Sequence, residues 1–272
     1  MATATRWSAA ALLVGACQTP GPRSSEPPAA VARPPARALP GAARSTQAKP
    51  AALLELFTSE GCSSCPPADE ALAEITERAK AQGTRVFTLE LHVDYWNYLG
   101  WADPFSNPVH GQRQAAYAER FDSGVYTPQL VVNGRSELVG TDVRSTRARI
   151  DEALADPPRA TVTIQARRMP DGVEVTYRVD TPQRIALCLA LADDHAETLV
   201  PRGENAHRRL THRHIVRAFE TRTLPTSATG TWLVHPASGA LLQQAFVAAY
   251  ATDPRTLAVL GADAAELPAG RD

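Results

Sequence analysis

Residues 61–67 read Gly-Cys-Ser-Ser-Cys-Pro-Pro, and this stretch stands between two segments of different character. Residues 53–58 before it are mostly apolar with strand character. Residues 68–82 after it are rich in Ala, Glu, Leu and Lys, with apolar residues at helical spacing. Two cysteines at a strand-to-helix turn can close a small disulfide ring, or present a thiolate to the positive end of the helix. The placement of Cys62 and Cys65 therefore favours thiol–disulfide exchange.

The same two-residue spacing also occurs in zinc sites. A four-thiolate zinc site needs a second such pair, or histidines at matching spacing. The chain has four cysteines, and Cys17 and Cys188 lie far from the pair and from each other. Redox use is favoured, and the sequence predicts no metal and no cofactor.

Composition sets broad limits on the partners of the chain. With 272 residues and 44% hydrophobic residues, it can bury more than one core. The net charge is −1 and no basic run stands out, so no nucleic-acid partner is expected. No apolar run reaches the length of a membrane-spanning helix in the mature chain.

The first fifty residues are expected to lie outside the fold. Residues 1–17 read as a secretory signal, and their Val-Gly-Ala-Cys ending resembles a bacterial lipoprotein box. This resemblance implies acylation of Cys17 and a lipid anchor in the membrane; the alternative is ordinary cleavage nearby, with Cys17 lost or incidental. Residues 18–50 are rich in Pro and Ala, which predicts a disordered tether. The protein is therefore expected in the periplasm or cell envelope.

Export sharpens the interpretation of the cysteine pair. Outside the cytoplasm, two cysteines without a metal persist either as a structural disulfide or as a redox-active pair that exchanges with other disulfides. A two-residue loop closes very little chain, so its disulfide contributes little stability. Exchange is again favoured.

The chain that follows the pair predicts a thioredoxin-like α/β domain over residues 51–156. Residues 85–93 read as a buried strand, which gives a parallel strand–helix–strand unit. Asn133-Gly134 between two strand-like runs is a strong hairpin signal. The remaining elements are expected as a helix at 108–121, strands at 129–132 and 135–139, and a helix at 142–155.

Thr127-Pro128 stands directly before one of these strands. In the thioredoxin fold, a cis-proline at this place lies opposite the cysteine pair and leaves a backbone edge free for an incoming peptide. The resemblance implies a cis bond before Pro128, a catalytic role for Pro128 and substrate contacts from Thr127. The alternative is a trans proline that opens an edge strand.

Four longer stretches carry a closer resemblance. They are residues 54–69, 92–105, 126–134 and 203–217, the last including Gly-Glu-Asn at 203–205 and Leu-Thr-His-Arg-His at 210–214. These stretches resemble a bacterial family of exported thioredoxin-like proteins that is catalogued as a domain of unknown function. The resemblance covers roughly residues 51–260 and implies a fold more than an activity, because the family has no established substrate.

Position suggests a mechanism for the pair. Cys62, at the helix N-terminus and expected nearer to solvent, is the predicted attacking thiolate, and Cys65 the resolving thiol. The hydroxyls of Ser63 and Ser64 could donate to the thiolate and make the disulfide more oxidising, or these small residues could simply fit the turn.

Further candidates lie on the two neighbouring strands. Glu55 lies on the same strand face as Leu53 and Phe57 in an otherwise apolar strand, where it could relay a proton to the second cysteine or pair with a local Lys or Arg. His92, Asp94 and Trp96 follow the second strand at its carboxyl end, where sites form in open α/β sheets. They are expected to shape a substrate groove, the alternative being aromatic packing over a long loop.

Residues 157–262 change to alternating apolar and polar residues, which predicts an antiparallel β-sandwich-like domain with a tail at 263–272. Cys188 lies in its nearly all-apolar strand and is predicted to be a buried, inert thiol. His212 and His214 share one strand face at a chelating spacing, but the surrounding arginines disfavour a cation there. Contacts to the other domain or to an anionic partner are the preferred interpretation.

Three functions remain open. The first is an extracytoplasmic thiol–disulfide oxidoreductase that acts on protein thiols and exchanges electrons with a redox partner protein. The second is a copper(I) metallochaperone that uses Cys62, Cys65 and His92. The third is a non-catalytic binding module on the same scaffold, with a structural disulfide.

Overall fold

The computed structural model describes residues 48–237 and 244–267. The predicted signal sequence with its lipid-anchor residue Cys17, the tether up to residue 47 and the last residues of the predicted tail lie outside the described residues. Among the residues that are described, no helix has both the length and the apolar character needed to cross a bilayer.

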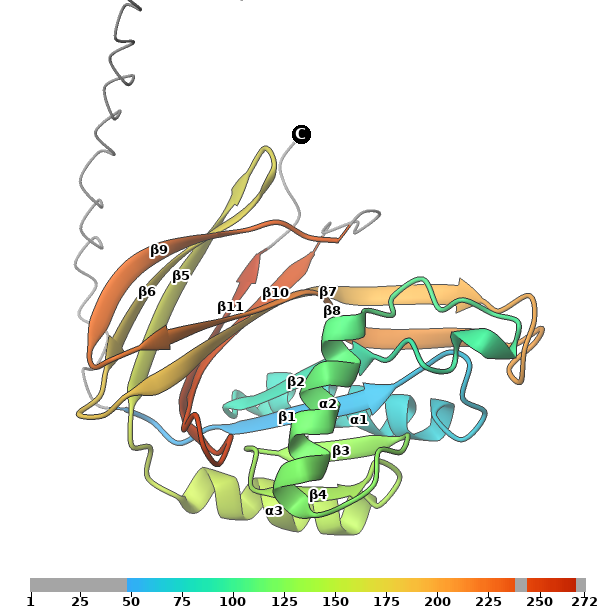
Figure 1. Ribbon diagram of the computed structural model, residues 1–272, viewed down its shortest axis with the longest axis horizontal. Coiled ribbons are helices and arrows are strands. Elements are labelled where there is room, and N and C mark those ends of the chain that lie inside the picture. Colours follow the sequence, from blue (N-terminus) through green and yellow to red (C-terminus); the bar gives the residue numbers. More distant parts are fainter. Residues whose placement is uncertain (1–47, 238–243, 268–272) are drawn as a thin grey trace, which may run out of the picture. The chain divides into compact units, whose positions relative to one another are not determined.

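The first half of the chain contains the predicted elements in the predicted order (Figure 1). β1 and β2 pair in parallel, and the Asn133-Gly134 turn joins the antiparallel β3 and β4, as the sequence indicated. The bounds are β1 (Ala52–Thr58), α1 (Pro66–Gln82), β2 (Val86–His92), a short 3-10 helix η1 (Asn97–Leu99), α2 (Pro108–Phe121), β3 (Gln129–Val132), β4 (Ser136–Val139) and α3 (Val143–Ala155).

The second half consists of strands. Their bounds are β5 (Thr161–Met169), β6 (Gly172–Asp180), β7 (Ile185–Leu199), β8 (Arg209–Leu224), β9 (Ala228–Val234), β10 (Ala245–Thr252) and β11 (Val259–Leu267). The sequence did not predict β10, whose many alanines have low strand propensity. β10 is nevertheless buried along its whole length between β7 and β11, so tertiary pairing decides its conformation.

The tail predicted from residue 263 is wrong over residues 263–267. β11 continues to Leu267, which pairs opposite Ala245 of β10. The Asp263 carboxylate also accepts the backbone N–H of Ile164 at 3.0 Å, so this segment is anchored from both sides.

One sheet of eight strands runs through both halves, in the order β11-β10-β7-β8-β2-β1-β3-β4. The halves meet where β8 runs parallel to β2, and Glu90 opposite Ile215 is the one registered pair between these two strands. The described residues form one compact unit, and the division expected at residue 156 stays a prediction.

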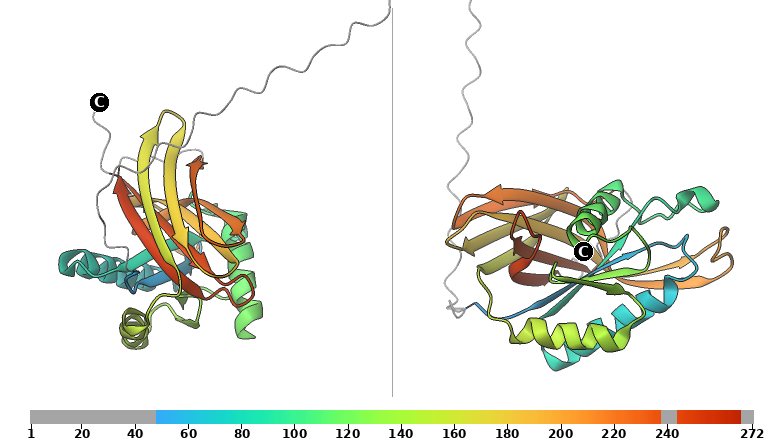
Figure 2. Two further views of the ribbon diagram at one scale, coloured as in Figure 1. Left: turned by 90° about the vertical axis from the view of Figure 1, so that its left-hand side faces the viewer. Right: turned by 60° about the horizontal axis from the view of Figure 1, so that its bottom comes forward.

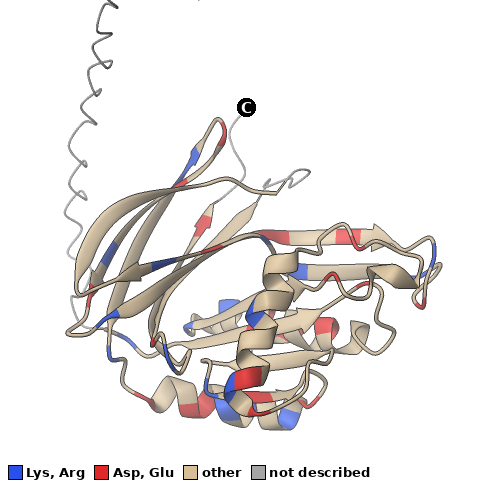
Figure 3. Ribbon diagram, in the orientation of Figure 1, with Lys and Arg blue, Asp and Glu red and all other residues tan. Residues whose placement is uncertain are grey.

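The two faces of β1 are covered by different helices, because strand residues point alternately to opposite sides. Leu54 and Leu56 pack with residues of α1 and α3. Leu53 and Phe57 pack with Tyr117 of α2 and with β10. Figure 2 brings α1 and α3 forward together in its right-hand view. Acidic and basic positions are both present along these outer helices (Figure 3).

A second core lies between the three-stranded sheet β5-β6-β9 and the outer strands β7, β10 and β11 of the large sheet. Buried residues of both layers, such as Val175, Leu187, Trp232 and Val247, meet there. Two facing layers of antiparallel strands therefore follow α3, although one layer is continuous with the sheet of the first half.

Candidate functional site

Cys62 and Cys65 form a disulfide at the start of α1. Cys65 directly precedes the helix, and Pro66 and Pro67 occupy its first positions. Proline is favoured there because its fixed φ suits a helix start and its missing N–H would have no helical partner. The sequence therefore forces the helix to begin directly after the pair, with the positive end of α1 at the disulfide.

Two of the predicted substrate-binding residues lie at the disulfide. The Thr127 hydroxyl donates to Cys62 Sγ at 3.2 Å, and Trp96 Nε1 donates to the Thr127 hydroxyl at 2.8 Å. The bond between Thr127 and Pro128 is cis, as the resemblance implied. The chain thus brings residues 96, 127 and 128 to the cysteine pair across more than thirty positions of sequence.

Cys62 is only 1% exposed in this disulfide form, so the expectation that it lies nearer to solvent is wrong. Cys65 is also buried, whereas Ser63 and Ser64 between them are exposed. The Ser64 hydroxyl lies 3.3 Å from Cys62 Sγ, which fits the proposed hydroxyl contact. The backbone N–H of Ser63 instead donates to Glu204 at 3.0 Å.

The segment 203–205, in the connection between β7 and β8, closes over the pair. The Asn205 side-chain amide donates to the backbone carbonyls of Glu60 at 2.9 Å and Cys62 at 3.0 Å. Gly203 has a φ of 83° and fits closely beside Trp101, where a side chain at this position would be crowded. The shielding of Cys62 thus involves Asn205, which is 143 positions away in the sequence.

Asn205→Ala should speed reduction of the disulfide by dithiothreitol at least about tenfold. The substitution leaves the buried Glu60 carbonyl without a donor and leaves the Cys62 carbonyl with only the Cys65 backbone N–H, at 3.2 Å. This loss costs about 1–3 kcal/mol and favours local opening of the segment. Thiol labelling over time measures the rate. Glu204→Gln, which keeps an acceptor for Ser63, is the matched control and should change little. Equal rates for Asn205→Ala and the unchanged protein would show that the segment does not limit access.

The described hydrogen-bond partners of the Glu55 carboxylate are an arginine and two tyrosines, and neither cysteine is among them. Its buried carboxylate pairs with Arg113 of α2, whose Nη2 lies 3.0 Å from Glu55 Oε2. The hydroxyls of Tyr117 and Tyr250 also donate to it. With these donors the carboxylate is held on the α2 face of β1, so the predicted proton relay is replaced by the alternative of a local arginine partner.

His92 is fully buried, and the prediction that it lines a substrate groove is wrong. Its Nδ1 lies 2.7 Å from Asp103 Oδ2, which also accepts the backbone N–H of Glu60 at 2.8 Å. Burial alone would lower the pKa of His92, but the Asp103 carboxylate outweighs it and raises that pKa to about 9. The ring belongs to a polar cluster inside the protein. Asp94, predicted beside it, is partly exposed.

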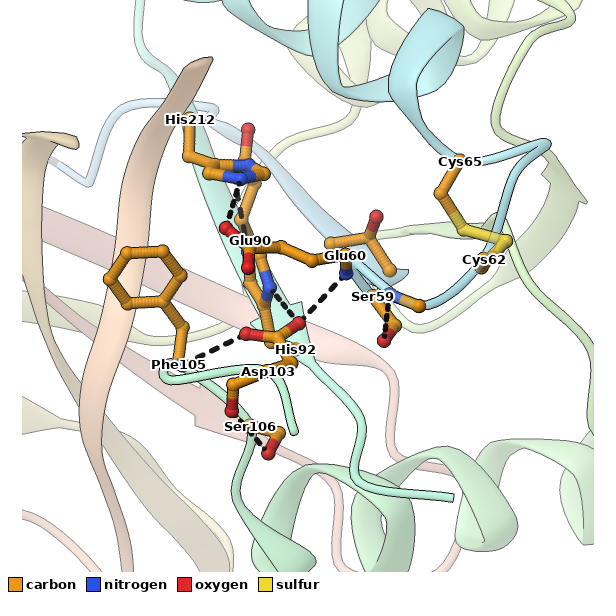
Figure 4. A network of polar contacts seen from close by, with 12 residues as sticks. Ser59, Glu60, Cys62, Cys65, Glu90, His92, Asp103, Phe105, Ser106 and His212 are labelled. Atoms are coloured by element: carbon orange, nitrogen blue, oxygen red, sulfur yellow. Dashed lines mark hydrogen bonds and ion pairs between the residues drawn. A yellow bond between two sulfur atoms is a disulfide. The ribbon is translucent and has the colours of Figure 1, made fainter. Parts of the chain in front are cut away.

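His212 of β8 completes this cluster (Figure 4). Its Nε2 lies 3.3 Å from Glu60 Oε1 and its Nδ1 lies 3.2 Å from Glu90 Oε2. The rings of His212 and His92 are 4.7 Å apart between centroids. Burial would lower the pKa of His212, but the adjacent carboxylates of Glu60 and Glu90 raise that pKa well above its ordinary value.

Asp69 approaches the same cluster from the first turn of α1. It is 3% exposed, accepts the Thr58 hydroxyl at 2.6 Å and lies 4.0 Å from His212 Nδ1. Burial and the nearby charge of Glu90 raise the pKa of Asp69 to about 7. Its place four residues after Cys65 puts this carboxyl one helical turn from the disulfide.

His212 and His214 do not act as a pair. His214 has a φ of 49°, so the strand is irregular at this point. Its ring stacks on Phe246 at 4.0 Å, and its Nδ1 lies 2.9 Å from the Thr88 hydroxyl. The histidine whose ring contacts His212 is His92, on a different strand. Cys188 is a buried free thiol, as predicted.

Sequence reasoning missed Glu60, Asp69, Glu90, Asp103 and Asn205. One signal was available for Glu90: Thr88, Glu90 and His92 alternate with leucines in a strand whose neighbours on both sides are buried. Polar residues on a covered face need partners, so that alternation indicates a buried polar cluster. No comparable pattern marks Asn205, because its partners are backbone atoms near residue 61.

Comparisons with known proteins agree with this architecture. A crystal structure of a structural-genomics target from Agrobacterium tumefaciens has a TM-score of 0.60 and 28% identity, covering 80% of this chain and 95% of that one. Catalytically inactive OgpA from Akkermansia muciniphila, in complex with an O-glycopeptide, has a TM-score of 0.30 and 13% identity, covering 64% and 39%. A TM-score this low supports no conclusion about the present chain.

No curated protein is significantly similar to the chain. The family model described as "Protein of unknown function (DUF1223)" matches residues 53–248, which is most of the chain. The protein therefore belongs to the DUF1223 family.

Proposed function

We propose that this protein is an extracytoplasmic thiol–disulfide oxidoreductase with a thioredoxin-like unit over residues 51–156. The carrying observation is the Cys62–Cys65 disulfide at the start of α1, with the Thr127 hydroxyl on Cys62 Sγ. In this proposal the chain is exported, held at the membrane through Cys17, acts on a protein disulfide or thiol, and is recycled by a redox partner protein.

The exchange reaction needs only the two cysteines and the substrate disulfide. The Cys62 thiolate attacks one substrate sulfur, which forms a mixed disulfide and releases the other sulfur as a thiolate. The Cys65 thiolate then attacks Cys62 Sγ, breaks the mixed disulfide and releases the second substrate thiolate. Two electrons pass to the substrate and the Cys62–Cys65 disulfide is formed; the reverse sequence oxidises a substrate dithiol.

The local surroundings of Cys62 support the role of attacking sulfur. The helix N-terminus favours negative charge, and the hydroxyls of Ser64 and Thr127 lie within reach of Sγ. Because Cys62 is shielded in the oxidised form, the proposal includes opening of the segment 203–205 before a substrate sulfur can approach. Trp96, partly exposed beside Thr127, is then placed to contact the substrate.

The burial of Cys62 favours one competing function, a non-catalytic module with a structural disulfide. The copper(I) alternative gains no such support. It requires His92 beside the two cysteines, whereas the described partners of His92 are carboxylates and another histidine.

Reduction potential and turnover separate the two remaining functions. The oxidoreductase should have a potential above about −300 mV, the level below which structural disulfides typically lie. It should also accelerate reduction of insulin by dithiothreitol, and Cys62→Ser with Cys65→Ser should remove the acceleration. A potential below this level together with no acceleration would instead identify the pair as a structural staple.

A further inference from the structure

Three buried polar atoms of the cluster lie close together, and none of them makes a hydrogen bond of normal geometry with another described residue. They are Glu90 Oε2, His92 Nε2 and His212 Nδ1. Glu90 Oε2 lies 3.6 Å from His92 Nε2 and 3.2 Å from His212 Nδ1, and all three atoms lie within 4.8 Å of one another. Buried polar atoms rarely lack a partner, so this convergence needs a cause.

Two of these separations, 3.2 and 3.6 Å, are close to the edge length of a tetrahedral metal coordination shell. A tetrahedral zinc ion bound at about 2.0–2.1 Å holds its ligand atoms about 3.3–3.4 Å apart. All three residues are fully buried, and no thiol is among them. Two imidazoles with one carboxylate suit zinc, whereas calcium and magnesium prefer shells made of oxygen ligands alone.

The other nitrogen of each imidazole is also held as a metal ligand requires. His92 Nδ1 faces Asp103 at 2.7 Å, and His212 Nε2 faces Glu60 at 3.3 Å. A carboxylate on the outer nitrogen fixes the tautomer and ring orientation of a ligating histidine. In Figure 4 the two rings and Glu90 converge, with Asp103 and Glu60 outside them and the disulfide beyond Glu60.

We propose that Glu90, His92 and His212 form a buried zinc site. Asp69, whose Oδ2 lies 4.0 Å from His212 Nδ1, is placed to supply the fourth ligand after a small shift. Four carboxylates surround the two imidazoles, from Glu60, Asp69, Glu90 and Asp103, and a divalent cation offsets their excess negative charge. The donors are shielded from solvent, which is typical of a structural site rather than a catalytic one.

The position of the site explains what the ion would do. Glu90 and His92 lie on β2 and His212 on β8, the two strands that join the halves of the large sheet through one registered pair. Asp69 adds the start of α1. Zinc bound there holds this junction together and fixes β8, the strand that follows residues 203–205. This role is independent of the redox proposal, because it uses neither cysteine.

The test is zinc binding by the oxidised protein, in which the disulfide prevents thiolate ligation. After chelation and dialysis, calorimetric titration should show that about one zinc ion binds per chain. Thermal unfolding of the same protein should show that added zinc raises Tm by at least about 5 °C. Cobalt in place of zinc should give the strong visible absorption of a tetrahedral site, without a sulfur charge-transfer band. The double variant Cys62→Ser, Cys65→Ser should bind zinc unchanged.

Ligand variants locate the site. Glu90→Gln and His212→Gln should each weaken zinc binding at least about a hundredfold. His195→Gln, a more exposed histidine on the neighbouring strand β7, is the matched control and should bind normally. If both ligand variants fail to fold, the cobalt spectrum of the unchanged chain decides. Absence of zinc binding by the folded protein, or its loss in the double cysteine variant, would overturn the proposal.

Discussion

Glu55→Gln is expected to lower the free energy of unfolding by about 3–5 kcal/mol, because it leaves the Arg113 guanidinium buried without its counter-charge. The Glu55 side chain is 1% exposed and that of Arg113 is 9% exposed. Arg113 also packs over the rings of Tyr117 and Tyr250, so it links α2 to β1 and β10. Urea unfolding followed by circular dichroism measures the loss.

Two control variants isolate the cause. Glu55→Gln combined with Arg113→Met removes both charges and should recover a large part of the lost stability. Glu152→Gln breaks the exposed pair with Arg149 on α3 and should change stability little. A small effect of Glu55→Gln alone, equal to that of the surface variant, would show that Arg113 finds another partner or solvent.

Cys65→Ala should convert the protein into a covalent trap for its substrate. Without the resolving thiol, the mixed disulfide on Cys62 has no internal route to release, so adducts should accumulate. The full-length variant expressed in the envelope of its own host should show bands of higher mass on a non-reducing gel, and dithiothreitol should remove them. Mass spectrometry then identifies the partner protein.

The same experiment separates catalysis from a structural disulfide. Cys62→Ser combined with Cys65→Ala is the matched control and should form no adducts. Adding Asn205→Ala to Cys65→Ala should increase adduct yield, if the segment 203–205 limits access to Cys62. A Cys65→Ala chain that is folded and secreted but carries no adduct would exclude Cys62 as an attacking thiolate.

Local signals in the sequence were sufficient for most of the first half of the fold. Pro66 and Pro67 set the start of α1, and Asn133-Gly134 set the β3–β4 hairpin. The contacts that cross the chain were not predictable in this way. β10 is a strand because β7 and β11 pair with it, although its alanines favour no strand by themselves.

The candidate site divides along the same line. The sequence by itself determined that Cys62 and Cys65 stand at a helix start, because turn chemistry acts over a few residues. The family resemblance implied that Thr127 and Pro128 lie opposite the pair, and the contact of the Thr127 hydroxyl with Cys62 Sγ agrees with it. Only the tertiary structure decided that Asn205 covers Cys62, that Glu55 pairs with Arg113, and that His212 joins His92 and Glu90. Such contacts join residues tens to more than a hundred positions apart, and burial leaves each polar group dependent on whichever partner the packing brings to it.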